Sequence, residues 1–354
     1  MGKLATFSPL PYPVYFITKN VEVWEDVMTG KTKPILENLY HRFVDANDSW
    51  STQPYIQLKQ RGLNVQLVSR VMPGKICIVT YEDLAIKDFP FNSYVIGCRH
   101  DRGRPKICEQ SIVQNPLNVI DKTDHFLPHW PQPGLKPRQH DRKSKVENLV
   151  YKGRGNNLAT PFKTDDFLLQ LENLGINFLM SPESTNRERV IDATNYQTAD
   201  VVLAVRNCTE YNLSIKPPSK LINAWFAGVP ALLGPEPAYQ QLRKSELDYI
   251  EVRSPNDVIQ ALQRLKNDPG LYLAMIENGY KRAQEFTPDQ IALRWRNLLA
   301  GEIARDYEKW CNQSSIYKTL GRPLQFAYRA IKHKRERKYF LENIHNGPRL
   351  FPED

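Results

Sequence analysis

The sequence predicts an α/β protein with two parallel-sheet domains and a set of C-terminal helices. Three observations support this fold class. Short apolar runs alternate with helical segments in both halves of the chain, as they do where helices join the strands of a parallel sheet. A proline-rich segment separates the two alternating regions, and 354 residues are enough to form two hydrophobic cores.

Four runs in the first half have the length and composition of buried strands. They are VYFIT (14–18), VQLVSRV (65–71), ICIVT (76–80) and YVIGC (94–98). TQPYIQLKQ, before the second of these runs, predicts a helix that ends at Gly62. The polar segment 20–49 is longer than an ordinary loop, and loops of this length are often functional lids or disordered.

Residues 124–145 differ in composition from the chain on either side. A basic patch follows four prolines that favour an extended, semi-rigid backbone: Pro128, Pro131, Pro133 and Pro137. Domain boundaries fall in segments of this kind. We therefore expect a first domain over residues 1–135 and a second over residues 136–310.

The alternation of strands and helices resumes in the second half. Strands are predicted at NLVYKG (148–153), INFLM (176–180), VVLAV (201–205) and ALLG (231–234). KTDDFLLQLENLG predicts a helix that ends at Gly175. Three later helices carry start signals, because Ser254, Asp268 and Thr287 each precede a proline and lie where an N-cap belongs.

The segment KPPSK (216–220) lies between a predicted strand and a short predicted helix. Ser219 is placed to cap this helix, and LINAWFA supplies its body. Gly228 fits a left-handed C-terminal position, and Pro230 prevents the helix from continuing into ALLG. The segment reads as a β-loop-α-β unit, whose helix starts at the carboxyl edge of a parallel sheet, where ligands bind.

The start of this helix has the chemistry of an anion site. Its first N–H groups and the positive end of its dipole attract phosphate, and Lys216 and Lys220 add full charges. Asn223 follows one turn later, where its amide suits a ribose or sugar hydroxyl. Arg206 and Arg154 follow neighbouring strands, so that four cations suit a diphosphate held without a metal ion. The alternative is a solvated loop with Asn223 facing water.

The bulk composition favours an anionic partner. A formal charge of +9 and a pI near 9.1 fit a nucleotide, a phosphorylated sugar, nucleic acid or an anionic lipid surface. Five scattered cysteines without CxxC spacing, and seven histidines without metal-ligand spacing, predict no structural metal and a reducing cytosol. Cys77 and Cys98 lie in apolar runs and are expected to be buried. No apolar run is long enough to span a bilayer.

Three motifs resemble the C-terminal domain of nucleotide-sugar-dependent glycosyltransferases of the GT-B fold. KPPSKLINAWFAGVPALLG is similar to their nucleotide-sugar-binding segment, VYKGR to their first strand and glycine-arginine turn, and DVVLAVR to the strand before the donor loop. The likeness covers about residues 146–310. It implies two Rossmann-like parallel-sheet domains that face a cleft, with acceptor binding in the first domain and donor binding in the second.

The resemblance also implies roles for residues at matching positions. Asn223 would meet the ribose or the sugar, and the donor diphosphate would be held by Arg154, Lys216, Ser219 and Lys220. The chain departs from the family where many retaining members carry two glutamates, because Ile215 and Asn223 occupy those positions. A lysine that usually follows the glycine-arginine turn is also missing. Inversion or retention at the sugar therefore stays open.

The first half supplies candidates for catalysis. CRHDRGRP (98–105) follows the strand YVIGC, which places His100 and Asp101 at the carboxyl end of that strand. Either side chain suits the general base of an inverting transferase. The alternative is a surface turn rich in charge.

Further candidates lie in two other segments. Asp45 and Asp48 are acids within DANDSW, and Trp50 would either stack on an acceptor sugar or anchor the following helix. In HWPQPG, His129 and Gln132 would either enter the cleft, with His129 binding the acceptor, or form part of a stiff linker.

The tail 311–354 is basic and aromatic. The GT-B resemblance implies that it packs back on the first domain. Six lysines or arginines within RAIKHKRERK (329–338) suit either a solvated helix face or contact with an anionic membrane surface.

These features predict a glycosyltransferase, of the hexosyltransferase type, that moves a sugar from a nucleotide diphosphate sugar to a saccharide or lipid-linked acceptor without a metal or other cofactor. The expected setting is polysaccharide biosynthesis in the cytoplasm, peripherally at the inner face of the membrane. Two alternatives stay open: a nucleotide-sugar epimerase of the same fold, and a basic nucleic-acid-binding protein on a transferase-like scaffold. The positive charge is spread widely and no RNP-type motif occurs, so no nucleic-acid partner is expected.

Overall fold

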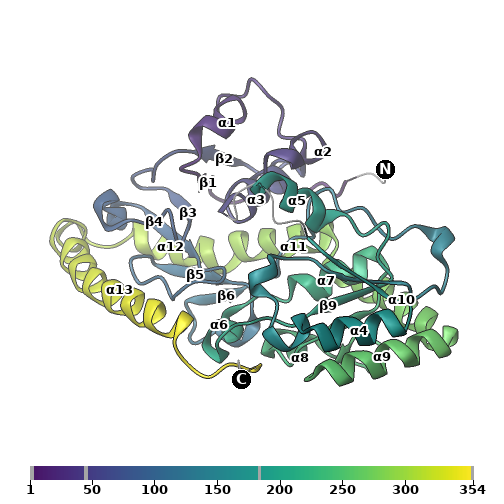
Figure 1. The fold of residues 1–354 in the computed structure, drawn as a ribbon. Helices are drawn as coiled ribbons and strands as arrows, with labels where there is room; N and C mark the ends of the chain where they lie inside the picture. Colours follow the sequence, from purple (N-terminus) through teal and green to yellow (C-terminus); the bar gives the residue numbers. More distant parts are fainter. Residues whose placement is uncertain (1–3, 44–46, 182–184, 352–354) are drawn as a thin grey trace. The chain divides into compact units, whose positions relative to one another are not determined.

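The computed structural model describes residues 4–43, 47–181 and 185–351. The chain forms two compact units (Figure 1). Unit 1 comprises Met1–Pro128 and Pro288–Glu342, and unit 2 comprises His129–Thr287 and Asn343–Asp354. The chain thus leaves unit 1 at Pro128 and returns to it at Pro288, whereas the sequence predicted boundaries at 135 and 310.

Unit 1 contains a six-stranded parallel sheet of order β2-β1-β3-β4-β5-β6. Its strands are β1 (Val14–Ile17), β2 (Val65–Val68), β3 (Ile76–Thr80), β4 (Tyr94–Cys98), β5 (Gln110–Val113) and β6 (Asp124–Phe126). The four predicted strands are confirmed. The prediction of an extended connector from residue 124 was wrong at its start, because Asp124–Phe126 pairs with β5 as the last strand. This short edge strand holds only one large apolar residue, so it lacks the apolar pattern of a buried strand.

Five α-helices and a long C-terminal helix surround this sheet in the described part of unit 1. They are α1 (Val21–Met28), α2 (Leu36–Leu39), α3 (Thr52–Gln60), α11 (Pro288–Leu298), α12 (Ala304–Cys311) and α13 (Arg322–His345, of which residues up to 342 belong to this unit). The polar segment 20–49 is not a plain loop, since α1 and α2 lie in its described part. Trp24 anchors α1 in the core, where its indole N–H donates to Asp48 at 2.8 Å.

Unit 2 contains a five-stranded parallel sheet of order β11-β10-β9-β7-β8. Its strands are β7 (Asn148–Tyr151), β8 (Asn177–Met180), β9 (Val201–Ala204), β10 (Ala231–Leu233) and β11 (Ile250–Glu251). Its helices are α4 (Asp165–Asn173), α5 (Asn186–Thr194), α6 (Glu210–Ile215), α7 (Ser219–Ala227), α8 (Pro237–Leu242), α9 (Pro255–Asn267) and α10 (Pro269–Ala283). Apolar residues of α4 and α9 pack on β7 and β9 to form the core.

Most predicted helix boundaries are confirmed by hydrogen bonds. Ser254 caps α9 by accepting from the N–H of Asp257 at 3.2 Å, and Asp268 caps α10 by accepting from Leu271 at 2.9 Å. Gly228 ends α7 with a left-handed φ of 67°. These local signals therefore set boundaries of α7, α9 and α10.

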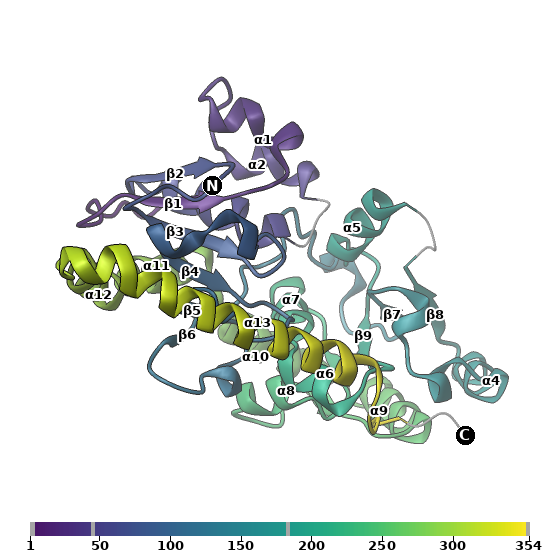
Figure 2. The same ribbon diagram turned by 90° about the vertical axis from the view of Figure 1, so that its left-hand side faces the viewer.

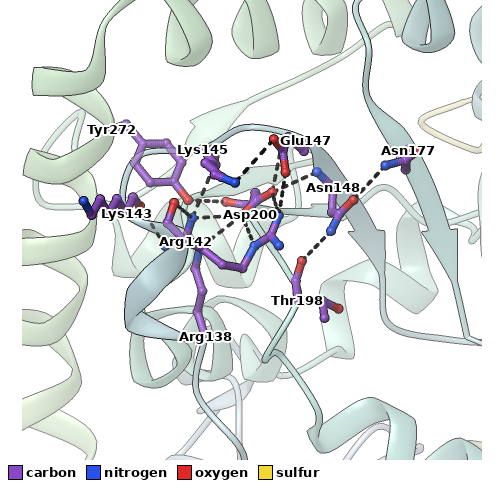
Figure 3. Close-up of polar contacts among 10 residues, drawn as sticks. All are labelled: Arg138, Arg142, Lys143, Lys145, Glu147, Asn148, Asn177, Thr198, Asp200 and Tyr272. Atoms are coloured by element: carbon purple, nitrogen blue, oxygen red, sulfur yellow. Dashed lines mark hydrogen bonds and ion pairs between the residues drawn. The ribbon is translucent and has the colours of Figure 1, made fainter.

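The connector that opens unit 2 is tied to the amino end of β9 (Figure 3). The carboxylate of Asp200 is fully buried and pairs with Arg138 at 2.8 Å and Arg142 at 2.6 Å. The same carboxylate accepts the backbone N–H groups of Glu147 at 3.0 Å and Asn148 at 2.9 Å. Burial works against this charge, but the two guanidinium groups and the amides lower the pKa of Asp200. The connector is thus fixed at the sheet edge opposite to the predicted ligand site.

Cys77 and Cys98 are buried free thiols, as predicted. Helix α13 lies across the unit 1 sheet (Figure 2), where Phe326 packs with Cys77 and Val95 of β3 and β4. Among the described helices, none is both long enough and apolar enough to cross a bilayer.

Candidate functional site

Helix α7 starts without a side-chain cap. The structure corrects the expected role of Ser219, because Pro218 holds the N-cap position and Ser219 is the first helical residue. Pro218 has no N–H to satisfy, and its carbonyl accepts the N–H of Ile222 at 3.2 Å. In the described chain the amides of residues 219–221 have no backbone acceptor. They therefore remain available to an anion, and the helix dipole adds attraction.

Lys220 connects the start of α7 to the carboxyl end of β7. Its ammonium donates to the carbonyl of Lys152 and lies 4.8 Å from the centre of the Tyr151 ring. Gly153 makes room for it, because a Cβ there would lie 3.2 Å from the Lys220 nitrogen. Burial, helped by the nearby charge of Arg206, lowers the pKa of Lys220 to about 7. A lysine with this pKa gains a proton readily when an anion binds beside it.

A buried ion pair lies at the same sheet edge. Arg206 follows β9 and Glu236 follows β10, with 3.2 Å between Nη1 and Oε2. Arg206 also donates to the hydroxyl of Tyr239 at 3.0 Å. Burial raises the pKa of Glu236, although the charges of Arg206 and Lys220 oppose this effect. Arg206 is less suited to contact a diphosphate than the sequence suggested, because the residue is only 9% exposed and its guanidinium already contacts Glu236 and Tyr239.

Two other predicted cations lie in loops of unit 2. Arg154 is exposed and precedes the turn Gly155–Asn157, whose last N–H bonds to the Arg154 carbonyl at 2.9 Å. Lys216 is half-buried and ends α6, three residues before α7. Arg154 therefore lies two residues beyond the carbonyl that Lys220 binds, on a loop open to solvent.

Asn223 is buried one turn into α7. Its side-chain oxygen accepts the backbone N–H of Gln132 at 3.3 Å, which leaves the NH2 group to donate to a ligand. This bond brings the HWPQPG segment to α7 within unit 2. His129 is half-buried, and its Nδ1 lies 2.6 Å from the carbonyl of Trp130.

In unit 1, His100 lies between two carboxylates at the carboxyl end of β4. Its Nε2 is 2.8 Å from Glu82, and its Nδ1 is 3.3 Å from Asp101. Burial opposes a charge on the imidazole, but Asp101 and Glu82 outweigh it and raise the pKa of His100. His100 is less suited than Asp101 to act as a base, because its ring is 5% exposed and both of its nitrogens already face carboxylates. Asp101 is more accessible, with 30% of its side chain exposed.

Trp50, which was predicted to stack on a sugar or to anchor a helix, is a buried core residue. Trp50 is 3% exposed, and its ring is stacked on His100 with an interplanar angle of 8°. The anchoring alternative therefore fits Trp50 better than contact with an acceptor. Asp48 is buried and accepts from Trp24, and Asp45 lies outside the described residues.

Several polar groups at the carboxyl edge of the unit 2 sheet were not predicted from the sequence. Glu236 is the first acid after β10, and Ser181 is the first residue after β8. Ser181 accepts the N–H of Gly153 at 3.2 Å and donates to Asp192, which pairs with Lys152 at 2.9 Å. The sequence offered one signal for these groups, their position: Ser181 and Glu236 follow strands, and Asp192 lies on the next helix. No three His, Cys, Asp or Glu side chains in the described ranges lie together as a metal site would require.

No protein-family model and no curated protein matches the sequence. Sucrose-phosphate synthase from Thermosynechococcus elongatus is structurally similar, with a TM-score of 0.51 and 14% identity over 84% of this chain and 99% of that chain. The Anabaena protein HepE in complex with UDP is similar over 86% of this chain and 100% of its own, at 10% identity and a TM-score of 0.44. Because the second score is below 0.5, the first comparison defines the fold. The chain has the GT-B fold, with two Rossmann-like parallel-sheet units and C-terminal helices.

Proposed function

We propose that this protein is a glycosyltransferase that moves a sugar from a nucleotide diphosphate sugar to a hydroxyl of a saccharide or lipid-linked acceptor. The observation that carries the proposal is the start of α7, where uncapped amides and Lys220 meet at the carboxyl edge of the unit 2 sheet. A pyrophosphate has the charge and the acceptor oxygens that such a helix start binds. The fold shared with a sucrose-phosphate synthase agrees with this chemistry.

In the proposed complex the donor phosphates lie on the amides of residues 219–221. Lys220 takes up a proton and neutralises part of the phosphate charge, and Arg154 contributes a second cation from its exposed loop. Fixed donors at this place also stabilise the charge that develops on the leaving diphosphate. Because protein groups meet the charge, the proposal requires neither a metal ion nor another cofactor.

The remaining groups have separate proposed roles. The NH2 group of Asn223 donates to a ribose or sugar hydroxyl, in place of the carboxylate that many family members have. Asp101 takes the proton from the acceptor hydroxyl, and His100 holds its carboxylate in position. A base acting on the acceptor implies an inverting reaction, which NMR of the anomeric proton of the product will test.

Binding is the first test. We expect one of UDP, GDP, ADP or dTDP, or the corresponding sugar nucleotide, to raise the melting temperature of the protein, and to do so equally in EDTA. Replacing Lys220 by alanine should remove most of this shift. If none of these nucleotides binds, the proposed function is wrong.

Turnover is the second test. A transferase releases nucleoside diphosphate only when an acceptor is present. Conversion of the donor sugar without release of nucleotide would instead identify an epimerase. Steep salt-dependent binding of DNA or RNA, without any nucleotide-sugar effect, would favour the nucleic-acid-binding alternative.

A further inference from the structure

Helix α13 has an inner face that packs on unit 1 and an outer face that does not. On the inner face, Phe326 joins the apolar cluster of β3 and β4, and Phe340 packs against Tyr81. His333 lies on the same side, where its Nδ1 is 3.4 Å from the N–H of Lys106. These contacts hold the helix in place, so that its opposite side is presented in a fixed orientation.

The outer face carries a stripe of exposed apolar residues. Its members lie three or four residues apart along the helix and the turn before it: Leu320, Leu324, Tyr328 and Ile331. Their exposed fractions are 61%, 71%, 58% and 54%. Tyr339 continues the stripe two turns later and is also exposed. Isolated exposed apolar residues are ordinary, but a periodic stripe opposite a packed face indicates a binding surface.

Most exposed charges beside this stripe are cationic, and the exception is Glu342, which lies 3.7 Å from Lys338. Between residues 316 and 341 every exposed charged side chain is cationic: Lys318, Lys332, Lys334, Arg335, Arg337 and Lys338. At about 100° per residue, Lys332 and Lys334 flank the stripe on opposite sides. Lys332 also lies 4.4 Å above the Tyr328 ring, so cation and apolar surface are adjacent. Glu336, the acid within this range, is half-buried near the N–H of Arg104.

We propose that the outer face of α13 docks the protein on an anionic membrane surface. An apolar stripe with flanking lysines and arginines matches a bilayer interface, where side chains such as Leu, Ile and Tyr enter the headgroup region and cations meet lipid phosphates. Charge complementarity favours this occupant over a second copy of the chain, because two such faces would bring two sets of cations together. The protein would lie on the membrane and not span it.

Within unit 1, the helix that carries the docking face also contacts the loop that holds the proposed base. The inner side of α13 contacts the loop that follows β4, since Phe340 lies against Gly103 and Glu336 accepts from Arg104. His100 and Asp101 belong to the same loop. A membrane held by the outer face therefore lies one helix away from these residues, which suits a lipid-linked acceptor. This last step rests on the proposed function, whereas membrane docking itself does not.

Sedimentation of the full chain with lipid vesicles tests the proposal. We expect the protein to sediment with vesicles of phosphatidylglycerol and phosphatidylcholine, and to stay in solution with vesicles of phosphatidylcholine alone. The variant L320S/L324S/I331S should weaken binding about tenfold or more, because it removes the apolar insertion. K332Q/K334Q should also weaken binding, and this loss should disappear at high salt, where screening already removes the electrostatic part.

Matched controls separate the helix face from general surface properties. L168S/L169S alters two exposed leucines of α4 in unit 2, and R264Q/K281Q lowers the net charge by the same amount as K332Q/K334Q. Both controls should bind vesicles like the unaltered protein. All variants should keep the original melting temperature, since the replaced side chains are exposed.

Three results would overturn the docking proposal. They are failure to bind anionic vesicles, equal binding by the stripe variant, and a dimer in analytical ultracentrifugation that the stripe variant dissociates while vesicle binding is absent. The last result would assign the face to a second copy. Nucleotide-induced melting shifts are measured on the same samples. Vesicle binding without any nucleotide effect would therefore contradict the proposed function and still support the docking proposal.

Discussion

The ammonium nitrogen of Lys220 lies 4.8 Å from the centre of the Tyr151 ring, which connects the first turn of α7 to the last residue of β7. The same nitrogen donates to the carbonyl of Lys152. The carbonyl accepts a hydrogen bond from this nitrogen whether or not the amine is protonated, so the contact holds the side chain at the strand end before any ligand arrives. A side chain ordered in advance loses less entropy when an anion binds.

Replacement of Lys220 by alanine should therefore weaken donor binding far more than it weakens the fold. We expect about a 10- to 100-fold loss of affinity for the nucleoside diphosphate, the range of a charge-assisted hydrogen bond. The free energy of unfolding should change by less than about 1 kcal/mol, because lost contacts are offset by removal of a desolvated amine. Isothermal titration calorimetry and denaturant unfolding measure the two quantities.

Lys281 provides the matched control for this variant. It is an exposed lysine of α10 in the same unit, and its replacement by alanine removes one charge without touching the start of α7. Donor affinity should stay within about twofold, since a distant surface charge is largely screened. Unchanged affinity in the Lys220→Ala protein would indicate that KPPSK is an ordinary solvated loop.

Donor binding should strengthen as the pH falls towards 7. In the free protein burial lowers the pKa of Lys220 to about 7, so the amine is mostly neutral at higher pH. A bound diphosphate favours the charged form and raises this pKa, and binding therefore takes up a proton. The gain in affinity is complete below the free-state pKa and is lost as the pH rises through the pKa of the complex.

Calorimetry in buffers of different ionisation enthalpy measures this proton directly. At about pH 8 we expect uptake of a fraction of one proton for each nucleotide bound. Lys220→Met cannot titrate, so its uptake should vanish and its affinity should be flat across the same range. Equal uptake by both proteins would assign the proton to another group.

The pair formed by Arg206 and Glu236 should show strong coupling in stability. Glu236→Gln leaves a buried guanidinium without its counter-charge, and we expect a loss of about 3–5 kcal/mol in the free energy of unfolding. Arg206→Met should cost less than this, because a buried carboxyl can take up a proton and become neutral. The double variant should lose less than the sum of the single variants.

The same two variants should move the pH dependence of donor binding in opposite directions. Removing the Arg206 charge raises the pKa of Lys220, and removing the Glu236 charge lowers it. Additive stability losses, or identical pH profiles, would contradict the coupling inferred here.

The sequence was a good guide to α7 because its signals are local. The apolar run of β9, the left-handed Gly228 and the apolar run of β10 each define a boundary without help from distant residues. The amino-terminal boundary moved by one residue, because Pro218 and not Ser219 takes the N-cap position in the backbone. The prediction that Lys220 and Asn223 lie near the start of the helix followed from that boundary.

Contacts between distant segments were not predictable in the same way. Arg206 follows a strand, as a phosphate ligand would, but Glu236 lies 30 residues away in sequence (236 − 206) and occupies its guanidinium. Strand β5 begins with Gln110 and Ser111, whose polar groups are buried through contacts with Tyr94 and Asp124. A single sequence does not reveal such partners, so apolar periodicity fails where polar groups are satisfied across the sheet.

Asp101 and His100 should differ in their effects on turnover. Asp101→Asn removes the proposed base, and we expect kcat to fall by about 10²- to 10⁴-fold with little change in nucleotide affinity. His100→Asn should reduce kcat less, because it keeps the proposed base and loses the contact that positions Asp101, along with the contacts to Glu82 and Trp50. Asparagine tolerates the positive φ of 36° at this position, so backbone strain does not confuse the comparison.

Steady-state kinetics with saturating donor separates these two effects. Retention of full activity by Asp101→Asn would exclude it as the base and would favour a retaining reaction that needs only phosphate stabilisation. A fall in kcat for both variants, accompanied by a lower melting temperature, would instead assign the pair to stability.

The stability of α7 should depend on Gly228 for two reasons that a control can separate. Its φ of 67° is left-handed, and a Cβ there would overlap the side chain of Tyr280. Gly30 shares the first property, with φ of 75°, but has open space around a Cβ. Gly30→Ala should therefore cost about 1 kcal/mol for the backbone alone, and Gly228→Ala at least about 1 kcal/mol more, because Tyr280 must move. Denaturant unfolding measures both losses, and equal losses would show that Tyr280 adapts freely and that the packing of α7 against α10 is looser than the structure shows.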